Sequence, residues 1–150
     1  MFEFMWHLGG SIRLDSTRPD EVVLERLERL LARQRKTVNE RNSATLAFDD
    51  PLWGEFGGPN WLAMVIYDRG RFWIERQHGE RRLNYDLRSL HGMAVCLLFA
   101  AIAFFGGLSN GGLLGGAKYA TGAFAWFYGM NILLALVRVP LAIRTAVGRD

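Results

Sequence analysis

Residues 89–108 read SLHGMAVCLLFAAIAFFGGL, twenty consecutive residues without a formal charge. A second uncharged stretch, YATGAFAWFYGMNILLALV, occupies residues 119–137. At about 1.5 Å of rise per residue, a helix of either length spans about 30 Å, the thickness of the hydrocarbon core of a bilayer. Only 88 residues precede these stretches, too few to bury two such helices on all sides. We therefore expect one transmembrane helix at 89–108 and a second at 119–137.

The charged residues divide the chain in the same place. Residues 1–88 carry 14 basic and 14 acidic side chains, whereas residues 89–150 carry four basic side chains and one acidic. The balanced first part is typical of a folded aqueous domain, so we assign residues 1–88 to one. A single cysteine, Cys96, excludes a disulfide-stapled secreted domain. The lack of a Lys/Arg cluster excludes a simple nucleic-acid-binding domain.

The flanking charges predict the orientation of the two spans. Residues 109–118 contain four glycines and one lysine, which is typical of a short, tight connection. Arginines precede the first span and follow the second, and positively charged flanks remain in the cytoplasm. We therefore expect 109–118 to be an external loop, with both termini cytoplasmic, including a basic tail at 138–150. The charges expected at the membrane interface are Arg82, Arg88, Arg138 and Arg144.

The excess of arginine over lysine, 16 to 2, is typical of a GC-rich bacterial genome. Together with the two spans, it predicts a multi-pass protein of the bacterial cell inner membrane.

The aqueous part alternates between apolar and polar residues at its start. Even positions from Phe2 to Leu14 are mostly apolar and odd positions mostly polar, as in a half-buried strand. A two-residue hairpin turn at Gly9–Gly10 would place Trp6 and Arg13 on the same face, so we expect one long strand with a bulge or bend at the glycines. Residues 17–35 predict a helix, with Thr17 and Asp20 placed as in a capping box.

Further strands are expected over 44–48, over the apolar run 61–67, and in a hairpin through residues 72–87 with turns at 68–70 and 78–79. The predicted element order is β-α-β-β-β-β. The fold class is therefore α+β, with one helix on a curved antiparallel sheet, followed by a two-helix transmembrane hairpin.

Small residues in the two spans predict close helix packing. Pairs with small-x-x-x-small spacing let helix backbones approach each other, and they occur once in each span. Asn131 lies opposite the small face of the second span, and an amide in hydrocarbon is costly unless it is bonded. We expect it to contact either the other helix of the chain or another subunit. The packing candidates are Ala103, Gly107, Gly122, Ala125, Gly129 and Asn131.

Residues 49–61, DDPLWGEFGGPNW, are the other concentrated feature. Asp49, Asp50 and Glu55 are acidic, but Asp-Asp-Pro is ordinary turn chemistry and we favour a turn. Trp53 and Phe56 either cover the core or contact a partner or the bilayer interface. We name both as candidate partner contacts.

The sequence contains no motif for catalysis, a metal or a cofactor. The three histidines lack ligands at zinc spacing, and no G-x-S-x-G or H-E-x-x-H occurs. We expect a non-catalytic accessory or scaffolding subunit of a membrane protein complex, without catalytic, cofactor or metal sites. Its expected partners are the lipid bilayer and another integral membrane protein or a second copy, and not nucleic acid. The alternative is a membrane-tethered regulatory or ligand-binding domain.

Overall fold

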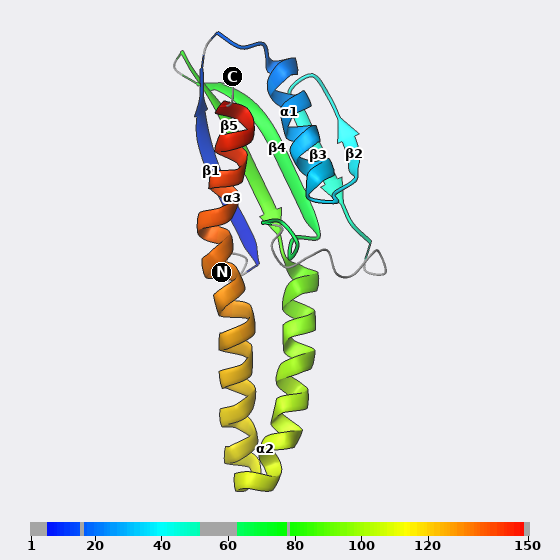
Figure 1. Ribbon diagram of the computed structural model, residues 1–150, viewed down its shortest axis with the longest axis vertical. Coiled ribbons are helices and arrows are strands. Elements are labelled where there is room, and N and C mark those ends of the chain that lie inside the picture. Colours follow the sequence, from blue (N-terminus) through cyan, green and yellow to red (C-terminus); the bar gives the residue numbers. More distant parts are fainter. Residues whose placement is uncertain (1–5, 16, 52–62, 78, 149–150) are drawn as a thin grey trace.

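The computed structural model describes residues 6–15, 17–51, 63–77 and 79–148. Five antiparallel strands form one sheet in the order β1-β5-β4-β3-β2, and a long apolar helical region extends from one end of it (Figure 1). The elements in chain order are β1 (His7–Leu14), α1 (Asp20–Arg33), β2 (Val38–Arg41), β3 (Thr45–Asp49), β4 (Arg69–Gln77), β5 (Glu80–Arg88), α2 (Leu90–Phe124), the π-helical turn η2 (Ala125–Gly129) and α3 (Met130–Gly148).

Strand β1 confirms the predicted alternation. It is a single strand, paired with β5 from His7↔Arg88 to Leu14↔Arg81 without a shift in register, so the expected bulge is not present. The chain needs Gly10 for another reason. A Cβ atom at Gly10 would lie 2.3 Å from the hydroxyl of Tyr85 on the adjacent strand. The missing side chain makes room for an aromatic ring on the inner face of the sheet.

The predicted central strand over 61–67 is wrong. Residues 63–66 form a turn, and residues 61 and 62 lie outside the described part. Met64 and Tyr67 are nevertheless almost fully buried. An apolar run shows that a segment is buried, but it does not show whether the segment is extended. The predicted order of elements still agrees with the observed one, because the structure contains a strand that we did not predict, β2. Its sequence, VNER, is mostly exposed and carries no apolar alternation.

Helix α1 is shorter than predicted. It begins at Asp20 after Pro19, whose φ of −59° suits a helix start, and no side-chain hydrogen bond caps it, so Thr17 is not the cap. Arg35, with φ of 57°, ends the helical path just beyond Arg33. The apolar stripe is confirmed, since Val23, Leu24, Leu27, Leu30 and Leu31 are all buried.

Two helices, rather than the predicted one, cover the inner face of the sheet. The second is the C-terminal half of α3, which lies beside α1 and against β1 (Figure 1). Ala135, Val139, Ile143 and Val147 recur at i+4 and join the same buried cluster as α1 and the strands. The segment 138–150 is therefore not a basic tail, because as far as Gly148 it is helical and part of the core.

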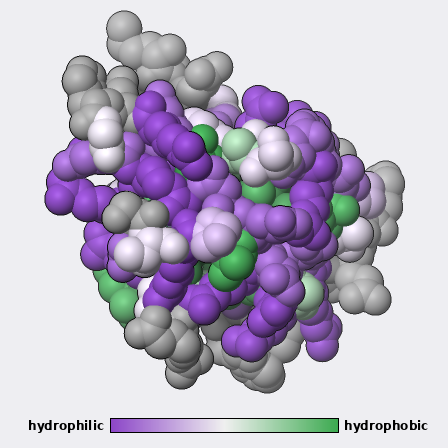
Figure 2. Space-filling model, turned by 90° about the horizontal axis from the view of Figure 1, so that it is seen from above, coloured by the Kyte–Doolittle hydropathy of each residue, from purple (hydrophilic) through white to green (hydrophobic). Residues whose placement is uncertain are grey.

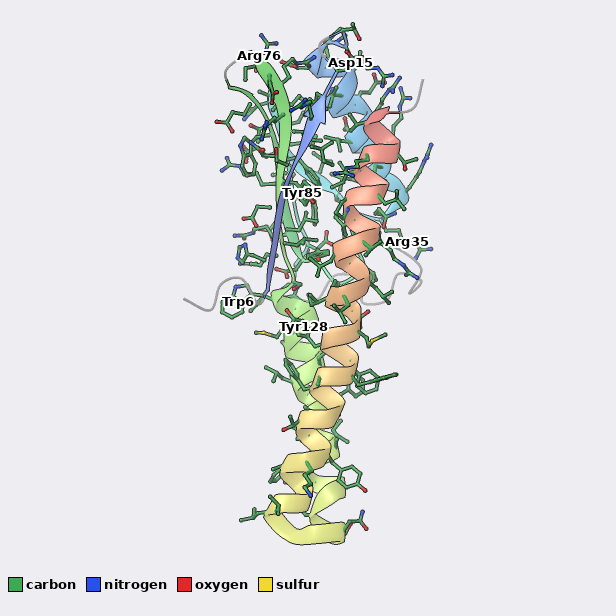
Figure 3. The ribbon with its side chains drawn as sticks, turned by 90° about the vertical axis from the view of Figure 1, so that its left-hand side faces the viewer. Trp6, Asp15, Arg35, Arg76, Tyr85 and Tyr128 are labelled. Carbon is green, nitrogen blue, oxygen red and sulfur yellow. The ribbon has the colours of Figure 1, made fainter. Side chains whose placement is uncertain are left out.

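The apolar region also differs from the predicted pair of helices with a loop. Helical structure continues from Leu90 to Phe124 through most of the expected loop at 109–118, and only Gly111 and Gly112 depart from it. Gly112 has φ of 58° and ψ of −149°, a backbone conformation that is essentially confined to glycine. The helical path kinks there. The segments before and after the kink lie side by side (Figures 1 and 3), with the rings of Phe99 and Phe127 6.0 Å apart.

By length and composition, the helical region Leu90–Gly148 is apolar enough to cross a membrane. Only 11% of its most apolar 18-residue window is buried within the protein, so this window exposes large apolar side chains, unlike the end of α3 that packs on the sheet. The opposite end of the molecule is mainly hydrophilic (Figure 2).

Candidate functional site

A buried carboxylate lies where the sheet meets the apolar helices. Asp68 follows the turn at 63–66, and its side chain is only 1% exposed. Its Oδ2 accepts hydrogen bonds from Nε and Nη2 of Arg88, and its Oδ1 accepts one from the backbone N–H of His91. His91 is in the first turn of α2, where N–H groups lack intrahelical partners. Asp68 therefore caps α2 from a distant part of the chain, since Ser89 at the N-cap makes no side-chain cap.

Ser89 instead joins three elements. It is fully buried, and its Oγ donates to the carbonyl of Trp6, immediately before β1, over 3.3 Å. The same Oγ lies 3.1 Å from the hydroxyl of Tyr128 in η2. Tyr128 lies at the junction between the sheet and the helices (Figure 3). These bonds tie the start of α2 to β1 and to the returning helical segment.

A second buried ion pair holds the segment between β3 and β4. Lys36 is 8% exposed, and its Nζ donates to Asp50 Oδ2 and to the carbonyl of Tyr67, both at 2.6 Å. The Nζ also lies 5.6 Å from the ring centroid of Phe48, which adds a cation–π contact. The phenol of Tyr67 is buried and has no hydrogen-bond partner among the residues that the structure describes, and this burial raises its pKa.

The ion pairs Asp68–Arg88 and Asp50–Lys36 stabilise the fold, and their charges are already paired. Both carboxylates are neutralised by a cation, and the two ion pairs fix the ends of the segment 50–68. In the described part of the chain, no three His, Cys, Asp or Glu side chains gather closely enough to hold a metal ion. His7 is bound to Asp86 on the outer face of the sheet, over 2.9 Å.

The structure separates the predicted packing residues into two groups. Gly107 packs closely, because a Cβ there would lie 2.8 Å from the carbonyl oxygen of Gly115 beyond the kink. Ala103, one turn earlier, is half-buried. Gly122 and Gly129 have nothing within 4 Å of a built Cβ, and Ala125 is exposed. The small face of the second segment is therefore open rather than packed within this chain.

Among the described residues, Asn131 hydrogen-bonds within its own helix rather than to the other helix of the chain, and its contact with another subunit stays a prediction. Its Nδ2 donates to the carbonyl of Phe127 in its own helix over 2.6 Å, directly after the π-helical turn, and its side chain is exposed. The bond satisfies one donor of the amide, which lowers the cost of placing the residue in an apolar segment.

The four charges predicted for the membrane interface lie at different distances from the start of the apolar helices. Arg88 is two residues before α2 and is held by Asp68. Arg82 is bound to Glu80 at the far end of β5, which holds the pKa of that carboxyl below its usual value. Arg138 and Arg144 are exposed on the half of α3 that packs on the sheet. Trp53 and Phe56, and Glu55 between them, lie outside the described residues.

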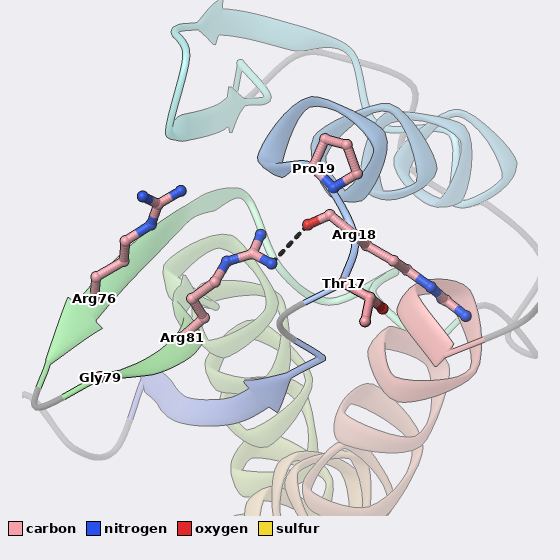
Figure 4. A pocket seen from close by; sticks show the side chains of 6 residues that line it. All are labelled: Thr17, Arg18, Pro19, Arg76, Gly79 and Arg81. Atoms are coloured by element: carbon pink, nitrogen blue, oxygen red, sulfur yellow. Dashed lines mark hydrogen bonds between the residues drawn. The ribbon is translucent and has the colours of Figure 1, made fainter.

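An arginine-lined hollow at the opposite end of the domain was not predicted. It has a volume of about 470 Å³ and is lined by Thr17, Arg18, Pro19, Arg76, Gly79 and Arg81 (Figure 4). It lies between the start of α1 and the β4–β5 turn. Arg76 and Arg81 face each other in register on β4 and β5. The signal available in the sequence was a pair of arginines flanking the predicted turn at 78–79, which brings them together.

Comparison with known proteins adds no identification. No protein-family model matches the chain, and no curated protein matches it in sequence.

Proposed function

We propose that the chain is an integral membrane protein in which each of the two apolar segments, before and after the kink at Gly111–Gly112, spans the bilayer. The first segment, residues 90–110, has a length of about 31 Å as a helix, matching the hydrocarbon core. The support is the exposure of large apolar side chains on both segments, including Leu98, Phe105, Leu133 and Val137, which are 61–70% exposed. In water this surface would drive aggregation, whereas in lipid it is the expected exterior.

The sheet domain is proposed to lie in the cytoplasm of a bacterial cell, against the inner membrane. Strand β1 and the end of α3 belong to the same domain, so both ends of the described chain are on one side of the bilayer. The arginine-rich flanks assign that side to the cytoplasm.

Single-cysteine variants test this topology in a Cys96→Ala background. In intact cells, a membrane-impermeant thiol reagent should label Asn110→Cys near the kink and spare Glu21→Cys on α1. Labelling of Glu21→Cys alone would reverse the orientation. Equal labelling of both positions in intact cells would contradict two crossings.

Within the membrane, we propose that the protein is a non-catalytic accessory or scaffolding subunit. The observation that carries this proposal is the continuity of α3, whose first turns are exposed and apolar and whose last turns lie in the core of the sheet domain. A helix shared in this way holds the aqueous domain in a fixed position relative to the membrane segment. The open face at Gly122, Ala125 and Gly129 offers a surface for another integral membrane protein or a second copy.

Substitutions on that face test the subunit proposal. Gly122→Leu with Gly129→Leu should leave the thermal stability of this chain unchanged, since nothing lies within 4 Å of either Cβ position. The same double variant should release the partner, or split the oligomer, in mild detergent. Gly106→Leu, another glycine facing open space, is the matched control and should stay assembled. Assembly that survives the double variant, or a native chain that is monomeric in every mild detergent, would refute the proposal.

One observation favours the alternative, a membrane-tethered ligand-binding domain. The hollow beside α1 is within the range of about 300–1,000 Å³ typical of small-molecule sites. Arg76 and Arg81 extend their side chains beside it, whereas the guanidinium of Arg18 points away and donates to the carbonyl of Val147 in α3 (Figure 4).

A further inference from the structure

We propose that the face of α3 turned away from the sheet lies against the bilayer surface, where Arg138 and Arg144 bind the phosphate groups of anionic phospholipids. We call this face the outer stripe, and its residues are Leu133, Leu134, Val137 and Leu141. The proposal rests on the proposed membrane crossing, and it adds that the sheet domain leans onto α3 instead of standing clear of the membrane. It does not depend on the scaffolding role.

The outer stripe is on the opposite side of α3 from the domain core. At about 100° per residue, its four members fall within about 100° of one another. They are 42–68% exposed, whereas Val139 and Ile143 are fully buried in the core. Helix α3 therefore has two apolar sides, and the sheet and α1 cover one of them.

The outer stripe extends beyond the point where α2 begins. Tyr128 lies beside Ser89, the residue before α2. Val137 and Leu141 follow Tyr128 by nine and 13 residues, about 14 and 20 Å further along the helix. Val139, between them, packs in the core, so both side chains lie beside the sheet domain (Figure 1). In an upright molecule this apolar surface would be in water.

The unequal lengths of the two apolar segments indicate a tilt. Residues 113–137 measure about 38 Å as a helix and residues 90–110 about 31 Å, against about 30 Å of hydrocarbon. Transmembrane helices tilt by up to about 40°, and the longer segment at that angle spans about 29 Å. Neighbouring helix axes are about 9 Å apart, so the same tilt toward α3 raises α2 by about 6 Å relative to α3. Both segments then end at one membrane surface, and the outer stripe faces the lipid headgroups.

The charges on α3 favour an anionic surface. Arg138 and Arg144 are exposed on the two flanks of the outer stripe, and neither forms an ion pair with a described residue. Residues 89–148 contain no acidic side chain. Phosphate headgroups would supply the missing anions. An arginine beside lipid can bury its methylene stem while its guanidinium binds a phosphate, as on the flanks of helices that lie in the membrane interface.

A second copy matches this face less well. Two copies in one bilayer share the membrane normal as their symmetry axis, so each residue of the outer stripe would lie near its own counterpart. Each Arg144 would then face another arginine, with no acidic side chain between residues 89 and 148 to separate them. Like charges oppose this contact, whereas anionic lipid attracts both arginines.

Spin labels on single cysteines test the proposal in the full chain, in a Cys96→Ala background. The protein is placed in nanodiscs of phosphatidylcholine and phosphatidylglycerol and exposed to oxygen, which concentrates in lipid, or to a water-soluble nickel chelate. Labels at Val137→Cys and Leu141→Cys should be more accessible to oxygen than to nickel. Arg71→Cys, on the outer face of the sheet, is the aqueous control and should show the reverse order. Leu98→Cys, in the first apolar segment, reports the crossing itself.

Removal of charge tests the two arginines. An arginine near an anionic leaflet favours association by a factor of about five. Arg138→Gln with Arg144→Gln should therefore shift the accessibility of the Leu141 label from oxygen toward nickel, as should nanodiscs of phosphatidylcholine alone. Arg71→Gln is the matched control and should leave that label unchanged, because Arg71 is on the other side of the domain.

Three outcomes would overturn the proposal alone. Labels at Val137 and Leu141 that favour nickel, with a label at Leu98 that favours oxygen, would leave the crossing intact and remove the surface contact. Labels shielded from both reagents, with dipolar broadening between two chains, would show a second copy on the outer stripe. A Leu141 label that responds neither to phosphatidylglycerol nor to the arginine substitutions would remove the headgroup contact. A label at Leu98 that favours nickel would instead refute the crossing, and the surface contact with it.

Discussion

Asp68 and Arg88 form an ion pair at the base of the sheet, with the Nη2 of Arg88 2.7 Å from Oδ2 of Asp68. The carboxylate is 1% exposed and the guanidinium side chain 26%. Because the other carboxylate oxygen accepts the N–H of His91, one side chain fixes both the end of β5 and the start of α2. The pair therefore sets the direction in which the apolar helix leaves the sheet domain.

Replacing Asp68 by asparagine should destabilise the protein strongly. The change leaves Arg88 without its counter-charge and removes the charge-assisted cap of α2, so we expect a loss of about 3 kcal/mol or more. Denaturant unfolding in detergent micelles measures it. Asp49→Asn is the control, because Asp49 pairs with Arg69 on the surface at 46% exposure and should cost less than about 1 kcal/mol. Equal losses in the two variants would contradict the role of Asp68.

Ile143→Ala tests whether the end of α3 belongs to the core. Ile143 is fully buried against α1 and the sheet, whereas Leu141 on the same helix is 61% exposed. Truncation of a buried isoleucine should lower the free energy of unfolding by about 2–5 kcal/mol. Leu141→Ala should have a much smaller effect. If both variants unfold at the same denaturant concentration as the native chain, α3 does not pack on the sheet.

Gly107→Ala tests the close contact of the segments on either side of the kink. An added methyl group would meet the Gly115 carbonyl and the Tyr119 ring, both at 2.8 Å, and should cost about 1–3 kcal/mol. Thermal unfolding in detergent measures the loss. Gly106→Ala meets nothing within 4 Å and should leave the midpoint unchanged or slightly raised. A Gly107→Ala variant as stable as Gly106→Ala would contradict the contact.

Tyr67→Phe should alter the response to alkaline pH. Burial raises the pKa of Tyr67, so the unfolded chain, with a phenol pKa of about 10, releases this proton before the folded protein does. The contribution to stability is complete below about pH 10 and declines as pH rises above it. The phenylalanine variant should lack this decline.

At neutral pH, Tyr67→Phe should be at least as stable as the native chain, because it removes a buried hydroxyl that has no partner in the described part of the chain. Unfolding free energies measured at neutral and alkaline pH check both expectations. Tyr119→Phe, at a side chain that is 55% exposed, is the control. An alkaline decline of the same size in Tyr67→Phe and in the native chain would assign it to other groups.

The sequence by itself determined the features that depend on neighbouring residues. Absence of charge over residues 89–108 and 119–137 was enough to identify a long apolar helical region, because hydropathy and helix length are local properties. The alternation through Leu8, Ile12 and Leu14 similarly placed these residues on the inner face of one strand. The prediction of a strand over 61–67 was wrong because burial alone does not distinguish a turn from a strand.

Only the tertiary structure decided which distant residues meet. Val139, Ile143 and Val147 lie in the segment that the sequence predicted to be a basic tail, and they belong to the core because α1 and the sheet supply the surface that covers them. Asp20 and Arg81 are 61 residues apart, and Ser89 and Tyr128 are 39 apart. Such contacts depend on strand register and on the kink at Gly112, which bring these side chains together. The residues next to them in the sequence do not indicate which partners they have.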